Sequence, residues 1–494
     1  MLFEILLSVV AVYLISYIIQ TWLECRKLPP GPIPLPFIGN LHQVGKKPPY
    51  TLMALCKNYP DVMTLKFPFG YCILLNSIEA VREAMLTKKT DFAGRPTEQF
   101  YPTTVIMGER DVATIDYGPA FVFRSKVFKS AVHLFGDQTQ KMEKRFHNIV
   151  LSMFTRLDKL IGENVDLNKV FENTIFALMW EWISSERLPH DDEKVKQLVE
   201  FIEKSSYLGR QGSYHQLFPL LRYLPSKFKT YLNEVLKSRY DLFGEVLDHH
   251  RATYKDGVVR DITDAMILSY NNEIKEGKNI HGTIDDVMFL MIDIIAAGAE
   301  TSVNALNWCI LHLVLREDIQ NKIHDELDNC MENKNMPNIL DLKKFHFLNA
   351  FVCEVFRLTT VSPFFPPHRT MRNTTVMGHK IPKNMMVLVN NYCVNSDPRN
   401  WDDPKSFDPK RFLQDNGEFV GWTKHQAFMP FGLGLRACPG KELAKLQLLT
   451  ILASFLNQYH FKLAENQKVP PLHDPVLGAT SHPQEYLVNF TKRK

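Results

Sequence analysis

Near the carboxyl end the chain reads Phe431-Gly432-Leu433-Gly434-Leu435-Arg436-Ala437-Cys438-Pro439-Gly440 and continues at once into the amphipathic run 441–456, KELAKLQLLTILASFL. The glycines allow a tight loop, and proline at a first helical position predicts that Cys438 lies at a helix N-terminus. There the helix dipole and free N–H groups lower the pKa of a thiol. A lone cysteine is often a small core residue, but this pattern indicates a metal ligand or a nucleophile.

A second segment, 283–315, predicts a helix of about 32 residues and ~48 Å. It is apolar nearly all round, so we expect burial on most faces. At its middle lies Ala297-Gly298-Ala299-Glu300-Thr301, where glycine costs ~1 kcal/mol relative to alanine and a buried carboxylate needs a partner. Small residues let a bulky planar ligand approach the backbone. The alternative is a helix-crossing contact with a hydrogen-bonded glutamate.

Periodicity elsewhere predicts a mainly α fold with a small β-sheet. No Gly/Ser linker or repeat follows residue 50, which favours one large domain. The expected strands are 62–67, 71–75 and 385–390. The other expected helices are 137–160, 193–207, 228–251, 317–332, 341–358 and 440–457.

The N-terminus predicts a membrane anchor over residues 2–23, LFEILLSVVAVYLISYIIQTWL, which is long enough to cross a ~30 Å hydrocarbon layer. Arg26 and Lys27 follow the apolar run, so the positive-inside rule places the rest of the chain in the cytosol. A buried core helix is the alternative. Residues 24–49 form a basic, proline-rich hinge, and 50–494 the predicted catalytic domain.

Composition narrows the function further. The chain has 494 residues, 45% of them hydrophobic and 23% charged, with a net charge of +4. This composition is typical of a globular protein. The net charge is too small to predict nucleic acid as a partner. None of the eight cysteines lies in a C-x-x-C pair, which argues against zinc modules and favours a reducing, cytosolic environment.

Four motifs together resemble the cytochrome P-450 superfamily. Residues 431–440 match every fixed position of its haem-binding loop, F-x-x-G-x-R-x-C-x-G, and 297–301 match the A-G-x-E-T of its oxygen-activation helix. Glu354-Val355-Phe356-Arg357 is similar to its E-x-x-R, and 408–412 to its P-x-R-F. The resemblance extends over 29–490 and implies the fold of that family, with one haem-binding domain behind the anchor.

The resemblance implies roles for particular residues. Cys438 would be the axial ligand of the iron of haem b, in a loop that includes Phe431 and Gly432. Thr301 and Glu300 would handle oxygen and protons, with Ala297 giving room. Glu354, Arg357 and Arg411 would form a half-buried structural ion-pair group behind the haem.

The haem propionates need donors, which the resemblance assigns to Arg110, His368 and Arg436. The family group usually carries Trp-x-x-x-Arg in its third helix, but here Phe121 and Ser125 stand at those positions. Arg124 would then substitute by a small shift in register.

The anchor and hinge resemble microsomal members. Residues 91–96, DFAGRP, with Pro367-His368 resemble the animal group of drug-metabolising enzymes and steroid 17-hydroxylases. The implied substrate is a small lipophilic molecule: a steroid, a fatty acid or a xenobiotic. Leu208 stands where steroid hydroxylases often carry a polar residue. The expected pocket residues are Ile106, Val112, Leu208, Asp293, Ala297, Val361, Phe364 and Phe365.

Electrons must come from outside, since no G-x-G-x-x-G follows a predicted strand. The resemblance implies NADPH and flavins acting through an NADPH–cytochrome reductase in the endoplasmic reticulum membrane, with cytochrome b5 as a second candidate partner. An expected basic face for the reductase comprises Arg124, Lys126, Lys129, Lys441 and Lys445.

The resulting hypothesis is a single-pass membrane monooxygenase that inserts one oxygen atom from O2 and faces the cytoplasm. Two alternatives stay open: a haem-thiolate binding or sensing protein without turnover, and a haem-thiolate isomerase or dehydratase. The pair Glu300-Thr301 favours the monooxygenase, because rearranging enzymes need no proton relay to dioxygen.

Overall fold

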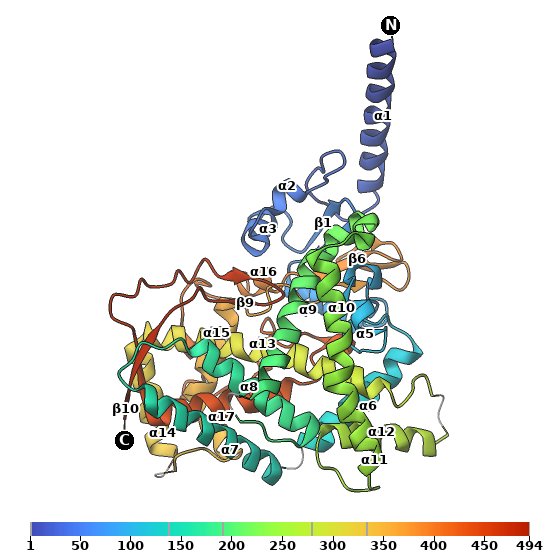
Figure 1. Cartoon of the computed structure of the whole chain (residues 1–494). Helices are drawn as coiled ribbons and strands as arrows, with labels where there is room; N and C mark the ends of the chain where they lie inside the picture. Colours follow the sequence, from blue (N-terminus) through green and yellow to red (C-terminus); the bar gives the residue numbers. More distant parts are fainter. Residues whose placement is uncertain (1, 137–138, 190–191, 278–279, 332–333, 494) are drawn as a thin grey trace. The chain divides into compact units, whose positions relative to one another are not determined.

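The computed structural model describes residues 2–136, 139–189, 192–277, 280–331 and 334–493 (Figure 1). Internal contacts divide the chain into two compact units. The first unit combines Met1–Pro96, Ser362–Lys405 and Gln426–Ala437, and the second combines Thr97–Val361, Ser406–His425 and Cys438–Lys494. The chain therefore passes between the units several times, and Cys438 is the first residue of its last passage.

The first unit is built on a four-stranded sheet with strand order β1-β2-β6-β3. β1 and β2 form an antiparallel hairpin, whereas β2 pairs in parallel with β6, from Cys72 opposite Met386 to Leu75 opposite Val389. Its elements are α1 (Leu2–Cys25), α2 (Leu41–Val44), α3 (Pro48–Cys56), β1 (Val62–Phe67), β2 (Gly70–Leu75), α4 (Ile78–Arg82), β3 (His368–Arg369), β4 (Thr374–Val376), β5 (His379–Ile381), β6 (Met386–Val389) and α16 (Asn391–Asn395).

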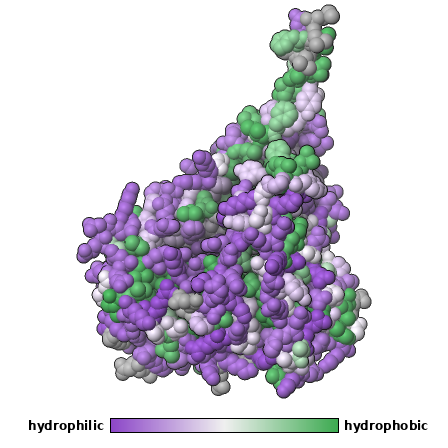
Figure 2. Space-filling model, viewed as in Figure 1, coloured by the Kyte–Doolittle hydropathy of each residue, from purple (hydrophilic) through white to green (hydrophobic). Residues whose placement is uncertain are grey.

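Helix α1 exposes most of its described apolar side chains, from Phe3 to Leu23, and Figure 2 shows green residues along this helix with paler ones between them. Its segment Phe3–Cys25 has a mean hydropathy of 2.0, and among the described residues it is the one helix long and apolar enough to cross a membrane. At its base the Lys66 ammonium donates to Thr21 Oγ1 at 2.9 Å, and the Tyr71 hydroxyl donates to Glu24 at 2.8 Å. Polar contacts thus attach the end of α1 to the β1–β2 hairpin.

The second unit is mainly helical. Its helices are α5 (Thr103–Met107), α6 (Pro119–Gly136), α7 (Thr139–Leu157), α8 (Leu167–Ser184), α9 (Glu193–Leu217), α10 (Lys227–Arg239), α11 (Glu245–Thr253), α12 (Ile262–Lys275), α13 (Asp286–Val314), α14 (Glu317–Met331), α15 (His346–Thr359) and α17 (Lys441–Gln458). Two small hairpins complete it, formed by β7 (Tyr459–Leu463) with β10 (Val488–Lys492), and by β8 (Val476–Leu477) with β9 (Ser481–His482).

Helix α13 runs through the core of the second unit, as its apolar composition predicts. It packs against α8, α15 and α17. Two stretches of α13 are buried, 286–295 and 302–313. In the interval between them, 296–301, Ala299 is buried and the other residues retain accessible surface. Trp180, Trp182 and Trp308 are fully buried in the same core.

The fold class is confirmed, and the expected helices and strands all have counterparts. β1 has the predicted bounds, and α13 begins three residues later than expected. The expected helix 228–251 contains a π-helical turn, Tyr240–Gly244, between α10 and α11. Residues 137–138 and 332, at the ends of two expected helices, lie outside the described part of the chain. Of the helices longer than ten residues, α6, α8 and α12 were not predicted. The single domain over 50–494 stays a prediction.

Candidate functional site

Cys438 lies two residues before Gly440, the N-cap of α17, so the helix begins later than the proline alone predicted. The Cys438 side chain is exposed to solvent. Protein atoms nevertheless crowd the thiol, and this desolvation raises its pKa, while the Gly440 N–H and Lys441 act in the opposite direction. The expectation of a lowered thiol pKa is therefore wrong for the protein alone, because the Gly440 N–H and the charge of Lys441 do not offset the desolvation.

The loop before Cys438 requires its glycines. Gly434 has φ +75°, and a Cβ there would lie 2.0 Å from the Met85 carbonyl oxygen. Gly432 has φ +69°, and its space is bounded by Ala437 and the ring of Phe365. A side chain at Gly434 would displace backbone, so the loop closes onto the segment that carries Met85.

The middle of α13 changes character over 296–301. Ala296 and Ala297 are exposed to solvent, although the helix is buried on both sides of this interval. Gly298 instead lies at a helix crossing, since a Cβ there would be 2.3 Å from the end of the Met179 side chain on α8. Ala297 therefore borders solvent, and Gly298 serves helix packing; the role of Ala297 in giving a ligand room stays a prediction.

Thr301 and Glu300 point their polar groups differently. The Thr301 hydroxyl donates to the Ala297 carbonyl at 2.7 Å, so its oxygen can accept a hydrogen bond from elsewhere. Glu300 accepts hydrogen bonds from the hydroxyls of Thr480, at 3.1 Å, and Ser206, at 3.5 Å. The sequence contained no signal for Thr480 or Ser206, because neither lies near Glu300 in the chain.

Glu354, Arg357 and Arg411 form one buried group. Arg357 donates from Nε and Nη2 to the two carboxylate oxygens of Glu354, at 2.7 and 2.6 Å. Arg411 Nε lies 3.6 Å from Glu354 Oε1. Burial raises the pKa of Glu354, although both arginines and the Asp408 N–H act against that rise. The pair is fully buried rather than half-buried, because α15 carries apolar residues on both flanks of it.

A basic cluster occupies the first unit around His368. The His368 Nδ1 lies 2.7 Å from the Phe92 carbonyl, and Arg436 Nε donates to the Ala93 carbonyl at 2.8 Å. Arg95, which is buried, donates to the carbonyls of residues 366 and 367. Burial, Arg95 and Arg436 hold the pKa of His368 well below its usual value. Arg95 was not predicted as a site residue, although it lies in the DFAGRP segment, 91–96.

Arg124 and Arg110 both approach one carboxylate. Arg124 donates from Nε to Asp286 at 2.8 Å and from Nη1 to the Glu109 carbonyl at 2.7 Å. Arg110 Nε lies 3.7 Å from the other oxygen of Asp286. Asp286 is buried at the first turn of α13. These arginines thus connect α6 and the loop before it to the start of α13.

The expected pocket residues lie in different environments. Leu208, Ile106 and Asp293 are buried, and the first two belong to the main core. Val361 packs at the edge of that core, and Phe364 packs against the small apolar cluster of the β-sheet. Of the predicted pocket residues, Val112, Ala297, Val361, Phe364 and Phe365 retain accessible surface.

Asp293 and Asp111 form a buried acidic pair. The Val112 N–H donates to Asp293 Oδ2 at 2.8 Å, which ties the 111–114 turn to α13. Asp111 accepts from Thr114 through one oxygen, and its other oxygen has no hydrogen-bond partner among the described residues. Burial and the charge of Asp111 raise the pKa of Asp293 well above its usual value. One of the two carboxyl groups is therefore protonated well above the ordinary range.

The expected basic face is only partly exposed. Arg124 is buried, Lys126 forms an ion pair with Glu273, and Lys445 pairs with Glu442 at 3.1 Å. Lys441 is about half exposed and lies 3.9 Å from the same Glu442 carboxylate. The structure thus leaves fewer unneutralised charges on this face than the sequence predicted.

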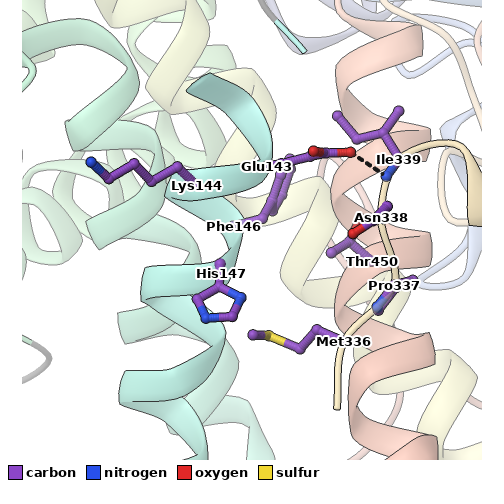
Figure 3. Close-up of a pocket in the computed structure, with 9 residues that line it drawn as sticks. All are labelled: Glu143, Lys144, Phe146, His147, Met336, Pro337, Asn338, Ile339 and Thr450. Atoms are coloured by element: carbon purple, nitrogen blue, oxygen red, sulfur yellow. Dashed lines mark hydrogen bonds between the residues drawn. The ribbon is translucent and has the colours of Figure 1, made fainter. Parts of the chain in front are cut away.

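A separate pocket of about 290 Å³ lies beside α7 (Figure 3). Glu143 closes one side by accepting the Ile339 N–H at 2.9 Å. Thr450, nine residues after the first residue of α17 and ~13 Å along that helix, also lines the pocket. The lining includes none of the predicted site residues, so this pocket is distinct from the candidate site.

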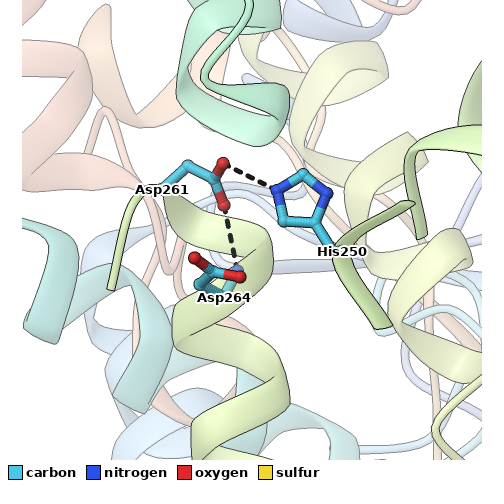
Figure 4. A group of neighbouring side chains, drawn as sticks. All are labelled: His250, Asp261 and Asp264. Carbon is cyan, nitrogen blue, oxygen red and sulfur yellow. Dashed lines mark hydrogen bonds and ion pairs between the residues drawn. The ribbon is translucent and has the colours of Figure 1, made fainter. Parts of the chain in front are cut away.

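A second polar cluster joins His250, Asp261 and Asp264 (Figure 4). His250 lies 2.7 Å from the Val246 carbonyl through Nδ1 and 2.8 Å from Asp261 through Nε2. Both ring nitrogens therefore face acceptors, and the pKa of His250 is raised by Asp261 against the effect of burial. Arg260 occupies both oxygens of Asp264. This arrangement is a pair of ion pairs, not an open metal site.

Comparison with known proteins defines the class. The Cytochrome P450 family profile matches residues 29–490. Cytochrome P450 1A1 of Rattus norvegicus is 29% identical over 480 residues, covering 94% of this chain and 91% of that protein. The steroid 17-alpha-hydroxylase/17,20 lyase of Squalus acanthias is 28% identical over 485 residues, with 95% and 94% covered.

Solved structures agree. A zebra fish cytochrome P450 with progesterone superposes with a TM-score of 0.80 at 26% identity, covering 90% of this chain and 99% of that one. A zebra fish cytochrome P450 with abiraterone gives 0.77 at 27% identity, over the same shares of both chains. The chain belongs to the cytochrome P450 family, whose members are haem-dependent monooxygenases.

The residues present fit the haem that the family implies. The first unit supplies a buried basic cluster suited to carboxylates. The second supplies a solvent-accessible thiol before a helix and exposed alanines within an otherwise buried helix.

Proposed function

We propose that this chain is a membrane-bound monooxygenase that inserts one atom of O2 into a small lipophilic substrate, with electrons from NADPH through a flavin-containing reductase. The observation that carries the proposal is Cys438, an exposed thiol that follows the loop of Gly432 and Gly434 and precedes α17. A thiolate-ligated haem supplies cleavage of the O–O bond. The chain's own residues bind the group, admit the substrate and deliver protons.

The basic cluster of the first unit is proposed to bind the propionates. The guanidinium groups of Arg95 and Arg436 beside neutral His368 favour an anion, because a negative charge would offset their positive charge in this buried place. His368 faces the Phe92 carbonyl through Nδ1, so protonation at Nε2 would give it a second donor. Arg110 and Arg124 are proposed as further contacts. A guanidinium has five N–H donors, and the contacts of Arg124 to Asp286 and Glu109 use two of them.

On α13, Thr301 is proposed to accept and pass a proton at its hydroxyl oxygen, and Glu300 to supply it through water. The Ala297 bond already uses the Thr301 proton, which orients the lone pairs of that oxygen. The exposed interval 296–297 is proposed to admit the substrate next to this hydroxyl.

The proposed substrate is a steroid-sized lipophile, with other xenobiotics and fatty acids in the same class. This rests on relatives named for steroid hydroxylation and on a neighbour solved with progesterone. The Val112, Val361 and Phe365 side chains are the proposed apolar contacts. The lining would be supported from behind by buried Ile106 and Leu208 and by Phe364, which packs against the sheet. Asp293 would support it indirectly, by holding the 111–114 turn.

The protein is proposed to lie in the endoplasmic reticulum membrane, with its catalytic part in the cytoplasm. Helix α1 exposes the apolar surface that a membrane would cover. The proposed redox partner is an NADPH–cytochrome reductase, with cytochrome b5 as a second donor. A chain without residues 2–23 should appear in the soluble fraction after cell lysis, whereas the full chain should sediment with microsomes.

The test of the enzyme is a pair of cysteine variants. Cys438→Ser should abolish the family's red-shifted carbon monoxide band of the reduced protein. Cys330→Ser on α14 removes another partly accessible thiol and should leave that band intact. Reconstitution with reductase, NADPH and a panel of steroids and fatty acids should give substrate-dependent NADPH use and products carrying one added oxygen. A band that survives in Cys438→Ser, or turnover that needs no reductase, would overturn the proposal.

A further inference from the structure

We infer that Thr480 is a positioning residue that fixes the carboxylate of Glu300 for proton delivery. This inference rests on the proposed function and deepens it, because it assigns part of the reaction to the C-terminal β8–β9 hairpin. Thr480 itself touches no reacting atom. Its hydroxyl donates to Glu300 Oε1 at 3.1 Å, and its residue is 5% exposed.

The direction of this hydrogen bond is set by Asn304. The Asn304 amide nitrogen donates to Thr480 Oγ1 at 2.8 Å. An amide nitrogen can only donate and a hydroxyl has a single proton. The Thr480 proton is therefore committed to Glu300. The two hydrogen bonds, from Asn304 to Thr480 and from Thr480 to Glu300, are donated in the same direction, and each therefore strengthens the other.

The backbone that carries Thr480 is fixed independently of Glu300. The Ser481 N–H donates to the Val361 carbonyl at 2.8 Å, and Trp308 Nε1 donates to the Ser481 carbonyl at 3.0 Å. Ser481 and Trp308 are each 1% exposed. Asn304 and Trp308 lie one and two turns beyond Glu300 on α13. Helix α13 thus fixes the β8–β9 hairpin through Trp308, and the hairpin in turn places the Thr480 hydroxyl against Glu300 of the same helix.

Glu300 needs such a partner. Its side chain has three rotatable bonds, and within the described part of the chain its second carboxylate oxygen accepts only the longer 3.5 Å contact from Ser206 of α9. Without Thr480, the carboxylate would sample rotamers directed away from its proton path. Misplacement of a proton donor lowers the rate of transfer without removing the donor.

A matched series of variants tests this inference. Thr480→Val removes the hydroxyl at nearly constant volume, and Thr480→Ser retains it. The double variant Thr480→Val/Asn304→Leu also removes the amide that the first change would leave unpaired. Thr359→Val is the control, because that hydroxyl bonds only to the Val355 carbonyl of its own helix among the contacts described.

The readout is the fraction of consumed O2 recovered as hydrogen peroxide by the full-length, reductase-reconstituted protein, without substrate and with progesterone as the probe lipophile. The carbon monoxide band is measured in parallel. Both valine variants should keep the carbon monoxide band. Their peroxide fraction should rise: the ratio of O2 not released as peroxide to O2 released as peroxide should fall about tenfold, as expected for the loss of one orienting hydrogen bond. Thr480→Ser and Thr359→Val should match the unmodified protein.

Coupling to Glu300 separates positioning from a general structural effect. On a Glu300→Gln background, Thr480→Val should add little further loss, since the residue it positions is already changed. Additive losses, or a Thr480→Val variant with unchanged peroxide release, would overturn the inference alone. Failure of the unmodified protein to show the band, or to consume oxygen with NADPH, would overturn the proposed function as well.

Discussion

Arg357 donates two parallel hydrogen bonds of 2.7 and 2.6 Å to the carboxylate of Glu354, and neither side chain is accessible to solvent. Arg357 also donates to the Ser406 carbonyl at 2.9 Å, and the Asp408 N–H donates to Glu354 at 2.9 Å. The pair therefore holds the 406–412 segment onto α15. We propose that the pair fixes the path of this segment and takes no part in the reaction.

Removing one partner of this pair should be costly. Glu354→Ala leaves a buried guanidinium without its carboxylate, and we expect a loss of about 3–5 kcal/mol in unfolding free energy. Urea titration followed by circular dichroism measures it. Glu193→Ala, in the exposed Lys196–Glu193 pair, should change stability by less than about 0.5 kcal/mol. Equal effects of the two changes would contradict the structural role.

The glycine loop allows a comparison at two positions of similar backbone. Gly434 and Gly417 have φ +75° and +83°, but only Gly434 has an atom within 4 Å of a built Cβ, the Met85 carbonyl oxygen at 2.0 Å. Gly417→Ala should cost about 1–2 kcal/mol from backbone strain. Gly434→Ala should cost more and should lower haem retention in purified protein. Similar thermal midpoints would show that the loop yields easily.

These two sites also mark what the sequence predicts. The E-x-x-R and glycine motifs were found because each lies within a few consecutive residues. Their full burial was not predicted, since burial depends on the 406–412 segment as well as on α15. Helices α6 and α8 were missed because they are buried on several faces, which weakens the amphipathic pattern. The partners of Glu300 and Arg124 lie far away in sequence, and local pattern contains no information about them.

The Asp111–Asp293 pair predicts a pH effect. Because the pKa of Asp293 is raised above its ordinary 3.8, the folded protein keeps a proton that the unfolded chain has released. Stability from this site therefore falls as pH rises above about 3.8 toward the folded-state pKa. Asp293→Asn cannot ionise and can still accept the Val112 N–H. Its thermal midpoint relative to the unmodified protein should rise between pH 5 and pH 8.

The matching control is Asp293→Ala, which removes the acceptor of the Val112 N–H and should be less stable at every pH. A relative midpoint of Asp293→Asn that stays constant with pH would contradict a raised pKa.

The His250–Asp261 ion pair also predicts a stability that falls as pH rises, here because a protonated imidazole loses its charge. The pKa of His250 is raised above 6.5 by Asp261, so the ion pair contributes fully below 6.5 and is lost as pH rises through the folded-state pKa. Asp264 adds to the raised pKa, Arg260 neutralises Asp264, and the Ser185 hydroxyl donates to Asp261. The thermal midpoint gap between the unmodified protein and His250→Asn should therefore narrow from pH 5.5 to pH 8.5. His147→Asn, at an exposed position on α7, should show no such trend.

The parallel pairing of β2 with β6 has a consequence for biosynthesis. A ribosome releases Leu75 long before Val389, so the nascent chain carries a strand edge whose neighbour has not yet been made. Such an edge is a template for aggregation, and it persists until translation has nearly ended. Prematurely terminated chains that stop before β6 should therefore be insoluble and subject to rapid degradation.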